Sequence, residues 1–170
     1  KRQGFRYAPA TRIYIQFNNR FWENESLNGW GNTDLPEEIW QPSWDMTGNT
    51  GVLMSYLRWS AAEDMDTLNQ DERNNAVLNR WENIFEGSIN NFDKGVSKSW
   101  VLDEWSKGAW ASPTTSQNET LNESIAQIEG RIHFAGEHAS NDRGWMQGAL
   151  FSGLRLSLIH ISEPTRPTPI

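Results

Sequence analysis

Residues 131–155 read RIHFAGEHASNDRGWMQGALFSGLR. Residues 131–135 are rich in strand-forming types and Gly136 follows them, so the pattern predicts a short strand that ends in a turn. From Gly144 onward, apolar side chains recur at the spacing of one helix face. These side chains are Trp145, Ala149, Leu150 and Leu154. The stretch therefore predicts a strand, a loop and a helix that begins at Gly144.

The opening of that helix is a candidate ligand site. The backbone N–H groups of a first helical turn have no partner inside the helix and lie at the positive end of its dipole, so they favour an anionic group. Gly144 lets a ligand approach the backbone closely, and the Glu137 carboxylate suits ribose-like hydroxyls. The pattern alone leaves two interpretations open, which are a ligand at a strand-to-helix turn and ordinary packing of a strand against a helix.

The order of residues is more specific than the pattern. FAGEH, a short loop and GWMQGALFSGLR closely resemble the C-terminal FAD-binding segment of the flavin amine oxidases, and within that family the segment of the L-amino-acid oxidases. The resemblance implies that FAD contacts Gly136, Glu137 and the helix opening. The residues implied at the opening are Gly144, Trp145, Met146, Gln147, Gly148 and Ala149.

Residues 12–17, RIYIQF, alternate between apolar and polar types, which predicts a strand. The longer run TRIYIQFNNRFW resembles the amine oxidase strand that passes under the flavin, where a lysine commonly holds a water near the reactive nitrogen. Arg12 stands at that position and is the candidate catalytic residue. Because a guanidinium cannot lose its proton, Arg12 is expected to hold a water or a carboxylate. A surface arginine on an edge strand is the alternative.

Residues 51–57, GVLMSYL, form a largely apolar run between turn residues, which predicts a buried strand. The run resembles the family strand whose tyrosine hydrogen-bonds the substrate carboxylate, and Tyr56 falls on that position. A phenol suits this task because it is a neutral donor on a stiff, mostly apolar body. A core tyrosine with a satisfied hydroxyl is the alternative. The arginine that completes the carboxylate clamp in relatives is expected upstream of this sequence.

Residues 99–110, SWVLDEWSKGAW, resemble the family segment that runs along the flavin ring. The resemblance implies that Trp100 supports the cofactor, with core packing as the alternative. Trp110 and Trp145 are implied to flank a nonpolar substrate and exclude water, and the Gly144 carbonyl to accept from the substrate amine. Ala109 stands where some relatives carry the cysteine of a covalent flavin link, so FAD is expected to bind noncovalently.

The remaining patterns complete a prediction of the α+β class. Asn69 followed by Glu72 predicts a capped helix over residues 70–86. Strands at 12–17, 51–57 and 131–135 are expected to join a mixed sheet with flanking helices at 70–86 and 144–157. Part of this sheet is expected to belong to a substrate domain, whereas the last strand and helix are the strand–loop–helix of a Rossmann-like FAD-binding domain. Residues 23–50 and 111–128 are expected to be loops, apart from a short strand at Ile39-Trp40.

The chain is predicted to divide into a substrate-binding portion (1–130), a FAD-binding segment (131–155) and a non-native tail (156–170). The tail resembles translated adaptor or cloning sequence in place of the expected helix, and three prolines in its last seven residues predict a disordered end. No Gly-x-Gly-x-x-Gly follows a strand, although flavin enzymes of this family need it for the FAD pyrophosphate. We therefore expect the C-terminal portion of a longer oxidase, which alone binds FAD weakly or not at all.

Composition and charge indicate which partners, metal sites and membrane segments the protein is expected to lack. Fifteen Lys and Arg against 22 Asp and Glu give a net charge of -7, which argues against nonspecific nucleic-acid binding. The sequence contains no apolar run of about 18 residues, so no membrane span is predicted. Without cysteine and with three histidines, no metal site is expected. Three sequons, at Asn24, Asn118 and Asn122, allow a secreted glycoprotein or arise by chance. The sequence leaves open whether the protein forms a homo-oligomer.

The resemblance implies FAD-dependent oxidative deamination of L-amino acids. The substrate amine would be oxidised to an imine that water hydrolyses to a keto acid and ammonia, while dioxygen is reduced to hydrogen peroxide. The alternatives are a monoamine or polyamine oxidase, which has no need of Tyr56 as a carboxylate donor, and an incomplete, inactive domain.

Overall fold

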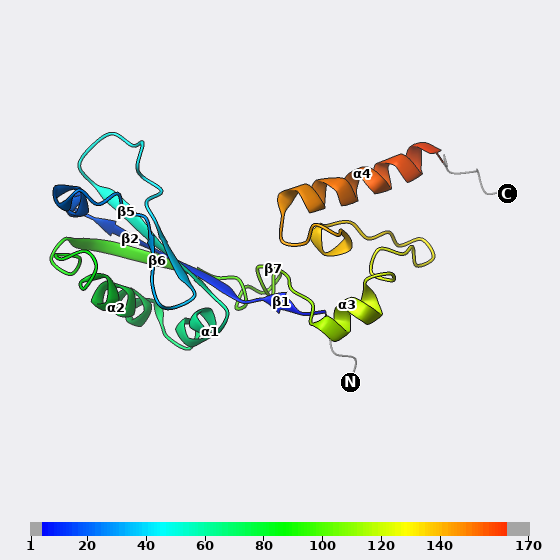
Figure 1. Cartoon of the computed structure of the whole chain (residues 1–170), viewed down its shortest axis with the longest axis horizontal. Helices are drawn as coiled ribbons and strands as arrows, with labels where there is room; N and C mark the ends of the chain where they lie inside the picture. The colour runs from blue at the N-terminus through cyan, green and yellow to red at the C-terminus, as the bar shows by residue number, and fades with distance from the viewer. Residues whose placement is uncertain (1–4, 163–170) are drawn as a thin grey trace. The chain divides into compact units, whose positions relative to one another are not determined.

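The computed structural model describes residues 5–162, and it describes side chains as far as residue 158 (Figure 1). The chain forms two compact units. We call Pro9–Ala109 the sheet unit, and Lys1–Ala8 together with Trp110–Ile170 the terminal unit. None of the helices within the described residues is both long and apolar enough to span a membrane.

The sheet unit contains a five-stranded sheet in the order β3-β4-β5-β2-β6. Its strands are β2 (Ala10–Phe17), β3 (Gly31–Asn32), β4 (Glu37–Trp40), β5 (Gly51–Arg58) and β6 (Phe92–Ser99). Every neighbouring pair runs antiparallel, so the prediction of a mixed sheet was wrong. Loops without a helix join β3 to β4 and β4 to β5, which suits antiparallel neighbours, because parallel neighbours need a long crossover. The strands predicted at 12–17, 39–40 and 51–57 are confirmed.

Helices α1 (Ser60–Asp66) and α2 (Gln70–Trp81) lie against one face of this sheet (Figure 1). Side chains alternate along β2, so Ile13, Ile15 and Phe17 are buried against the helices while the residues between them are half-buried on the other face. Aromatic packing completes this core, and η1 (Phe21–Glu25) contributes Phe21 and Trp22. The sequence predicted neither α1 nor β6.

The start of α2 was predicted correctly and its end was not. The Asn69 side chain accepts from the Glu72 N–H, and the Glu72 carboxylate accepts from the Asn69 N–H, which is the expected capping box. Regular helix ends at Trp81 rather than at residue 86. The Glu82 carboxylate accepts hydrogen bonds from the N–H groups of Gly87 and Ile89, which holds the following residues in turns. These hydrogen bonds also lower the pKa of Glu82.

A buried ion pair joins α2 to β4. Glu37 is 2% exposed, and its carboxylate accepts from Arg80 Nε at 3.1 Å and from Nη2 at 3.0 Å. The hydroxyls of Thr33 and Ser55 also donate to Glu37. A buried carboxylate needs this full set of partners, because desolvation would otherwise oppose burial of the charge.

The terminal unit is built from short elements. Strands β1 (Tyr7–Ala8) and β7 (Trp110–Ala111) pair antiparallel, and α3 (Thr115–Leu121), η2 (Glu137–Ala139) and α4 (Met146–Ser162) follow. Helix α3 lies in the region predicted to be a loop, and a capping box between Thr114 and Gln117 starts it.

The predicted strand at 131–135 does not form. Ile132 instead exchanges two backbone hydrogen bonds with Glu129 in a tight turn, as an isolated bridge. A strand needs a neighbour for its backbone groups, and no strand of residues 5–162 pairs with this segment. The Phe134 carbonyl accepts instead from Arg155 at 2.8 Å. The predicted strand–loop–helix is therefore a loop followed by a helix.

The helix predicted from Gly144 is confirmed, but it begins at Met146 and continues to Ser162. It thus extends through the first residues of the predicted tail, where the sequence indicated a loss of the helix. The disordered end was predicted from three prolines, and those prolines lie outside the described residues.

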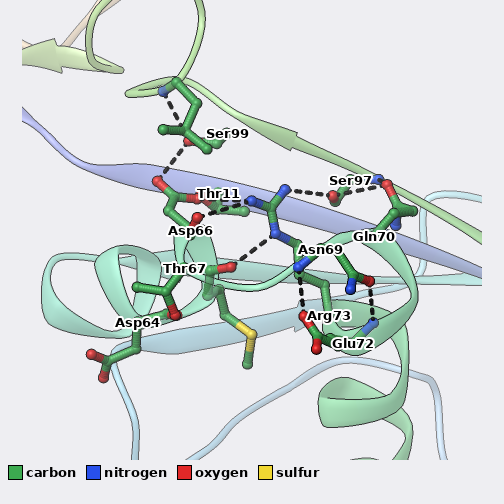
Figure 2. A network of polar contacts seen from close by, with 12 residues as sticks. Thr11, Asp64, Asp66, Thr67, Asn69, Gln70, Glu72, Arg73, Ser97 and Ser99 are labelled. Atoms are coloured by element: carbon green, nitrogen blue, oxygen red, sulfur yellow. Dashed lines mark hydrogen bonds and ion pairs between the residues drawn. The ribbon is translucent and has the colours of Figure 1, made fainter.

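A polar network fixes the ends of two strands to the helix layer (Figure 2). Asp66 accepts a hydrogen bond from Thr11 Oγ1 at 2.7 Å and from Ser99 Oγ at 2.6 Å. Arg73 Nη2 lies 3.9 Å from the same carboxylate, and Arg73 Nη1 donates to Ser97 Oγ at 3.0 Å. Asp66 therefore ties α1 to the start of β2 and to the end of β6.

We expect Asp66→Ala to lower the free energy of unfolding by about 3 kcal/mol, because hydrogen bonds to a mostly buried charge are lost and the hydroxyls are left unsatisfied. Urea unfolding followed by circular dichroism measures the change. Asp64→Ala, an exposed position on the same helix, is the matched control and should change stability by less than about 0.5 kcal/mol. Equal losses in the two variants would contradict this role of Asp66.

Candidate functional site

The sheet face opposite α1 and α2 brings together the two residues predicted for substrate chemistry. Arg12 on β2 and Tyr56 on β5 are direct partners in the β2–β5 register. The Arg12 guanidinium carbon lies 4.6 Å from the centroid of the Tyr56 ring, which is a cation–π contact. Trp40 of β4 packs edge-on against the same ring, with centroids 6.1 Å apart.

A second arginine lies near the same ring but differs in its charge balance. The Arg58 guanidinium is 5.5 Å from the Tyr56 centroid, and its Nη2 lies 2.7 Å from the Glu38 carboxylate. Arg12 forms no salt bridge within the described residues, and its Nε is buried without a hydrogen-bond partner. Arg12 is thus an uncompensated cation on a partly buried surface.

Tyr14 is a neighbour of Arg12 that the sequence analysis did not single out. Burial acts to lower the pKa of Arg12, but interactions with Tyr14 and Tyr56 outweigh it and raise the pKa above its ordinary value. The signal was present in the sequence, because the period of two along a strand places residues 12 and 14 on the same face.

Trp100 follows β6 in the sheet unit. Lys98 Nζ lies 5.6 Å from the centroid of the Trp100 ring and also forms an ion pair with Asp103. That pair, with hydrogen bonds to Ser106 and Trp105, holds the pKa of Asp103 well below its usual range. Lys98 is therefore a compensated cation, in contrast to Arg12.

In the terminal unit, Glu137 organises the approach to α4. Its Oε1 accepts from the Ala111 N–H at 2.8 Å, and its Oε2 accepts from the Gly144 N–H at 2.7 Å. Burial, and secondarily the charge of Glu137, raise the pKa of Tyr7. One carboxylate thus joins β7 to the loop that leads into the helix, and its remaining lone pairs stay available to a ligand.

Glycines make close packing before and inside α4 possible. Gly144 has φ +78°, a left-handed conformation, and a Cβ there would lie 3.3 Å from Trp110 Cδ1. A Cβ on Gly148 would lie 2.0 Å from the Asp142 carbonyl oxygen. Gly136, with φ +141°, donates its N–H to Ser152 Oγ at 2.8 Å. The implied cofactor residues Gly136, Glu137 and Gly144, together with Trp110, therefore share one unit.

We compared the sequence with models of known protein families. Residues 2–157 match the family model described as flavin containing amine oxidoreductase. The chain belongs to this family.

Curated relatives of the chain include L-amino-acid oxidases. "Putative L-amino-acid oxidase YobN" of Bacillus subtilis is 36% identical over 156 residues, which cover 89% of this chain and 33% of that protein. An L-amino-acid oxidase of the snake Bungarus fasciatus is 30% identical over 87% of this chain and 30% of its own length. The chain thus spans about a third of the length of these relatives.

Solved structures share the fold of this chain over most of its length. Putrescine oxidase bound to putrescine matches with a TM-score of 0.78 at 19% identity, over 90% of this chain and 35% of that one. Cyclohexylamine oxidase from Brevibacterium oxydans matches with a TM-score of 0.79 at 18% identity, over 94% of this chain and 36% of that one.

The opening of α4 has features that suit a flavin. Trp145 is 69% exposed and Met146 80% exposed, and Gln147 and Ala149 are exposed as well. Gly148 of the same turn is instead buried against the Asp142 carbonyl, so the surface at the opening is formed by the other residues of the turn. The N–H groups of a first helical turn have no partner inside the helix. Donors at the positive end of a helix suit the electron-rich edge of a flavin ring, and the neighbouring indole suits its flat face.

We expect Gly148→Ala to destabilise the terminal unit by about 1–3 kcal/mol, because the added methyl group forces the Asp142 carbonyl and α4 apart. Gly153→Ala is the matched control on the same helix. A Cβ there meets nothing within 4 Å, so this variant should gain about 0.5–1 kcal/mol of helix stability. Hydrogen exchange of the α4 amides measures both changes, and equal signs would contradict the packing role of Gly148.

We expect Glu137→Gln to lower the pKa of Tyr7 towards its ordinary value, because a negative charge that opposes ionisation of the phenol is removed. NMR titration of ring-labelled tyrosine resolves the three tyrosines individually. Since folding holds the pKa of Tyr7 up, its contribution to stability is complete below the unfolded-state pKa and disappears as the pH rises through the folded-state value. An unchanged Tyr7 titration in the variant would rule out this interaction.

Proposed function

We propose that the chain is part of an FAD-dependent oxidase that deaminates L-amino acids to keto acid, ammonia and hydrogen peroxide. Family membership supports flavin-dependent amine oxidation. The observation that favours amino acids over simple amines is the pair of Arg12 and Tyr56 on the open sheet face. A phenol donor beside an uncompensated guanidinium suits an anionic substrate group.

The cofactor-binding residues proposed in the terminal unit are Gly136, Glu137 and the opening of α4 from Gly144 to Ala149. The chemistry that FAD would supply when bound is acceptance of a hydride equivalent from the substrate α-carbon, with dioxygen as the final electron acceptor. The part of this chain is to hold the cofactor noncovalently and to place helix N–H donors where negative charge develops. Trp100 of the sheet unit is proposed to support the cofactor through its indole ring.

The substrate-binding residues proposed are Tyr56, Trp110, Gly144 and Trp145. Tyr56 donates a hydrogen bond to the carboxylate, and the Gly144 carbonyl accepts one from the amine. Trp110 and Trp145 offer flat, apolar faces that exclude water from the reacting carbon. The catalytic role proposed for Arg12 is to hold a polar group in place, because a guanidinium does not exchange its proton at neutral pH.

A simple-amine oxidase is the second candidate, because the solved structures with the same fold include putrescine and cyclohexylamine oxidases. Peroxide release from the full-length enzyme that contains this chain decides between the two. Each amino acid is compared with the amine that lacks its carboxylate. Faster turnover of the amines would overturn the proposal.

We expect Tyr56→Phe in that full-length enzyme to lower kcat/KM for amino acids by about tenfold to a hundredfold, since a hydrogen bond to a charged group is lost. Equal values of kcat/KM in the Tyr56 variant and the wild type would remove Tyr56 from the site.

A further inference from the structure

We propose that Arg143 and Arg155 of the terminal unit form a binding site for a small dianion of the phosphate type. Both arginines line one pocket of about 230 Å³, which lies between the residues that follow α3, the loop after η2 and the middle of α4. The described residues that line this pocket include none of those proposed for flavin or substrate. The site is therefore additional to the proposed function and does not depend on it.

Both guanidinium groups are anchored on the same short helix, η2. Arg143 Nε donates to the His138 carbonyl at 3.2 Å, and Arg155 Nη1 donates to the Ala139 carbonyl at 3.2 Å. Because these carbonyls belong to consecutive residues, two positive charges are held near each other at the wall of the pocket. Like charges at short distance repel each other, and an anion that lies near both relieves this repulsion.

The other hydrogen-bond partners of the two guanidinium groups are neutral. Arg143 Nη1 and Nη2 donate to the side-chain oxygens of Asn118 at 2.8 Å and Asn122 at 2.7 Å. Arg155 Nη2 donates to the Phe134 carbonyl at 2.8 Å. Neither guanidinium forms a salt bridge within the described residues. Neutral oxygens orient a guanidinium but leave its charge in place, so each arginine is fixed and still attracts an anion.

Acidic side chains of the neighbouring segments do not pair with these charges. Glu119, Glu123 and Asp142 are exposed to solvent, where screening weakens their influence. The Glu137 carboxylate accepts instead from the backbone N–H groups of β7 and of the loop before α4. The positive charge at the pocket is therefore left for a ligand.

Several donors remain accessible to that ligand. A guanidinium has five N–H donors, and within the described residues Arg143 donates three hydrogen bonds and Arg155 donates two. Arg155 Nε donates to no atom of the described residues and is not buried, so an anion can reach it from solvent. Ser140 also lines the pocket, and its Oγ accepts from the Asp142 N–H at 3.1 Å, which leaves the hydroxyl proton free to donate.

The charge and the direction of these donors favour phosphate over a carboxylate. A phosphoryl group carries a charge of about −1.5 to −2 at neutral pH and three strong acceptor oxygens. Arg143 precedes α4 and Arg155 lies within it, and different oxygens anchor the two side chains, so their donors do not share one plane. A carboxylate has one charge and two coplanar oxygens, which match a single guanidinium and leave the second cation unpaired.

The test uses the full-length protein that contains this chain, with saturating FAD so that the cofactor site is filled. Isothermal titration calorimetry at constant ionic strength measures the affinity for inorganic phosphate and for acetate. We expect saturable phosphate binding with a Kd of about 1 mM or lower, and acetate binding at least tenfold weaker. No saturable binding up to about 10 mM phosphate, or equal binding of the two anions, overturns the inference.

Phenyl phosphate distinguishes a phosphate ester from the free ion. Ile125, Ala126 and Phe151 line the same pocket, so an ester could place its apolar group against them. Binding of phenyl phosphate that is tighter than that of inorganic phosphate would identify an ester as the ligand, and equal or weaker binding would identify the free ion. Both results support recognition of the phosphoryl group.

Two variants assign the binding to this pocket. Arg143→Gln should weaken phosphate binding about tenfold to a hundredfold, because hydrogen bonds between charged groups are lost. Arg131→Gln is the matched control, since it removes one positive charge from an exposed residue of the same unit that does not line the pocket. This control should stay within about twofold of the wild type, and equal affinities in the two variants would overturn the inference.

Thermal unfolding separates ligand binding from a purely structural role of Arg143. Phosphate should raise the Tm of the wild type and of Arg131→Gln, because a ligand stabilises the state that it binds, but it should not raise the Tm of Arg143→Gln. An equal rise in all three proteins would exclude this pocket as the site. If Arg143→Gln does not fold, Arg143→Lys keeps the charge without the planar fork, and undiminished phosphate affinity in that variant would also overturn the inference.

Discussion

The double pairing of β2 is the constraint on which both the core and the candidate site depend. This strand bonds to β5 along one edge and to β6 along the other, so a change of register would break two ladders at once. Because side chains alternate, the fixed register buries Ile13 and Ile15 against the helices and holds Arg12 on the opposite face. Asp66 adds a side-chain tie at the start of the strand. The orientation of Arg12 thus follows from the packing of the whole unit.

Charged side chains of the sheet unit differ in how fully their charges are paired. Glu37 is buried beneath the helices with a bidentate arginine and two hydroxyls, so the cost of removing its charge from water is offset on every side. On the other face, the ion pairs of Arg58 and Lys98 compensate charges that flank Arg12, while Arg12 keeps an unsatisfied Nε. Full compensation marks the residues that hold the fold together.

In the terminal unit, close contacts support the start of α4 while its first side chains remain exposed. Glu137 fixes Gly144 and Ala111 through backbone N–H groups, and Gly148 brings α4 against the Asp142 carbonyl. These contacts lie to one side of the opening, while Trp145 and Met146 remain largely exposed. These hydrogen bonds and close contacts hold the loop before α4 in place while the two side chains at its start stay accessible.

The sequence by itself determined the features that depend on neighbouring residues. The capping box at Asn69, the alternating strand around Arg12, the apolar strand around Tyr56 and the helix after Gly144 all follow from local pattern. The order of FAGE, GW and SGLR indicated the family. Only the tertiary structure decided that residues 131–135 form no strand. It also decided that β6 forms one edge of the sheet despite its polar sequence, and that Asp66 binds the ends of two strands. It also decided that Arg12 forms no salt bridge within the described residues. Each of these depends on partners far away along the chain, because strand pairing, burial and charge compensation are set by which segments meet in space.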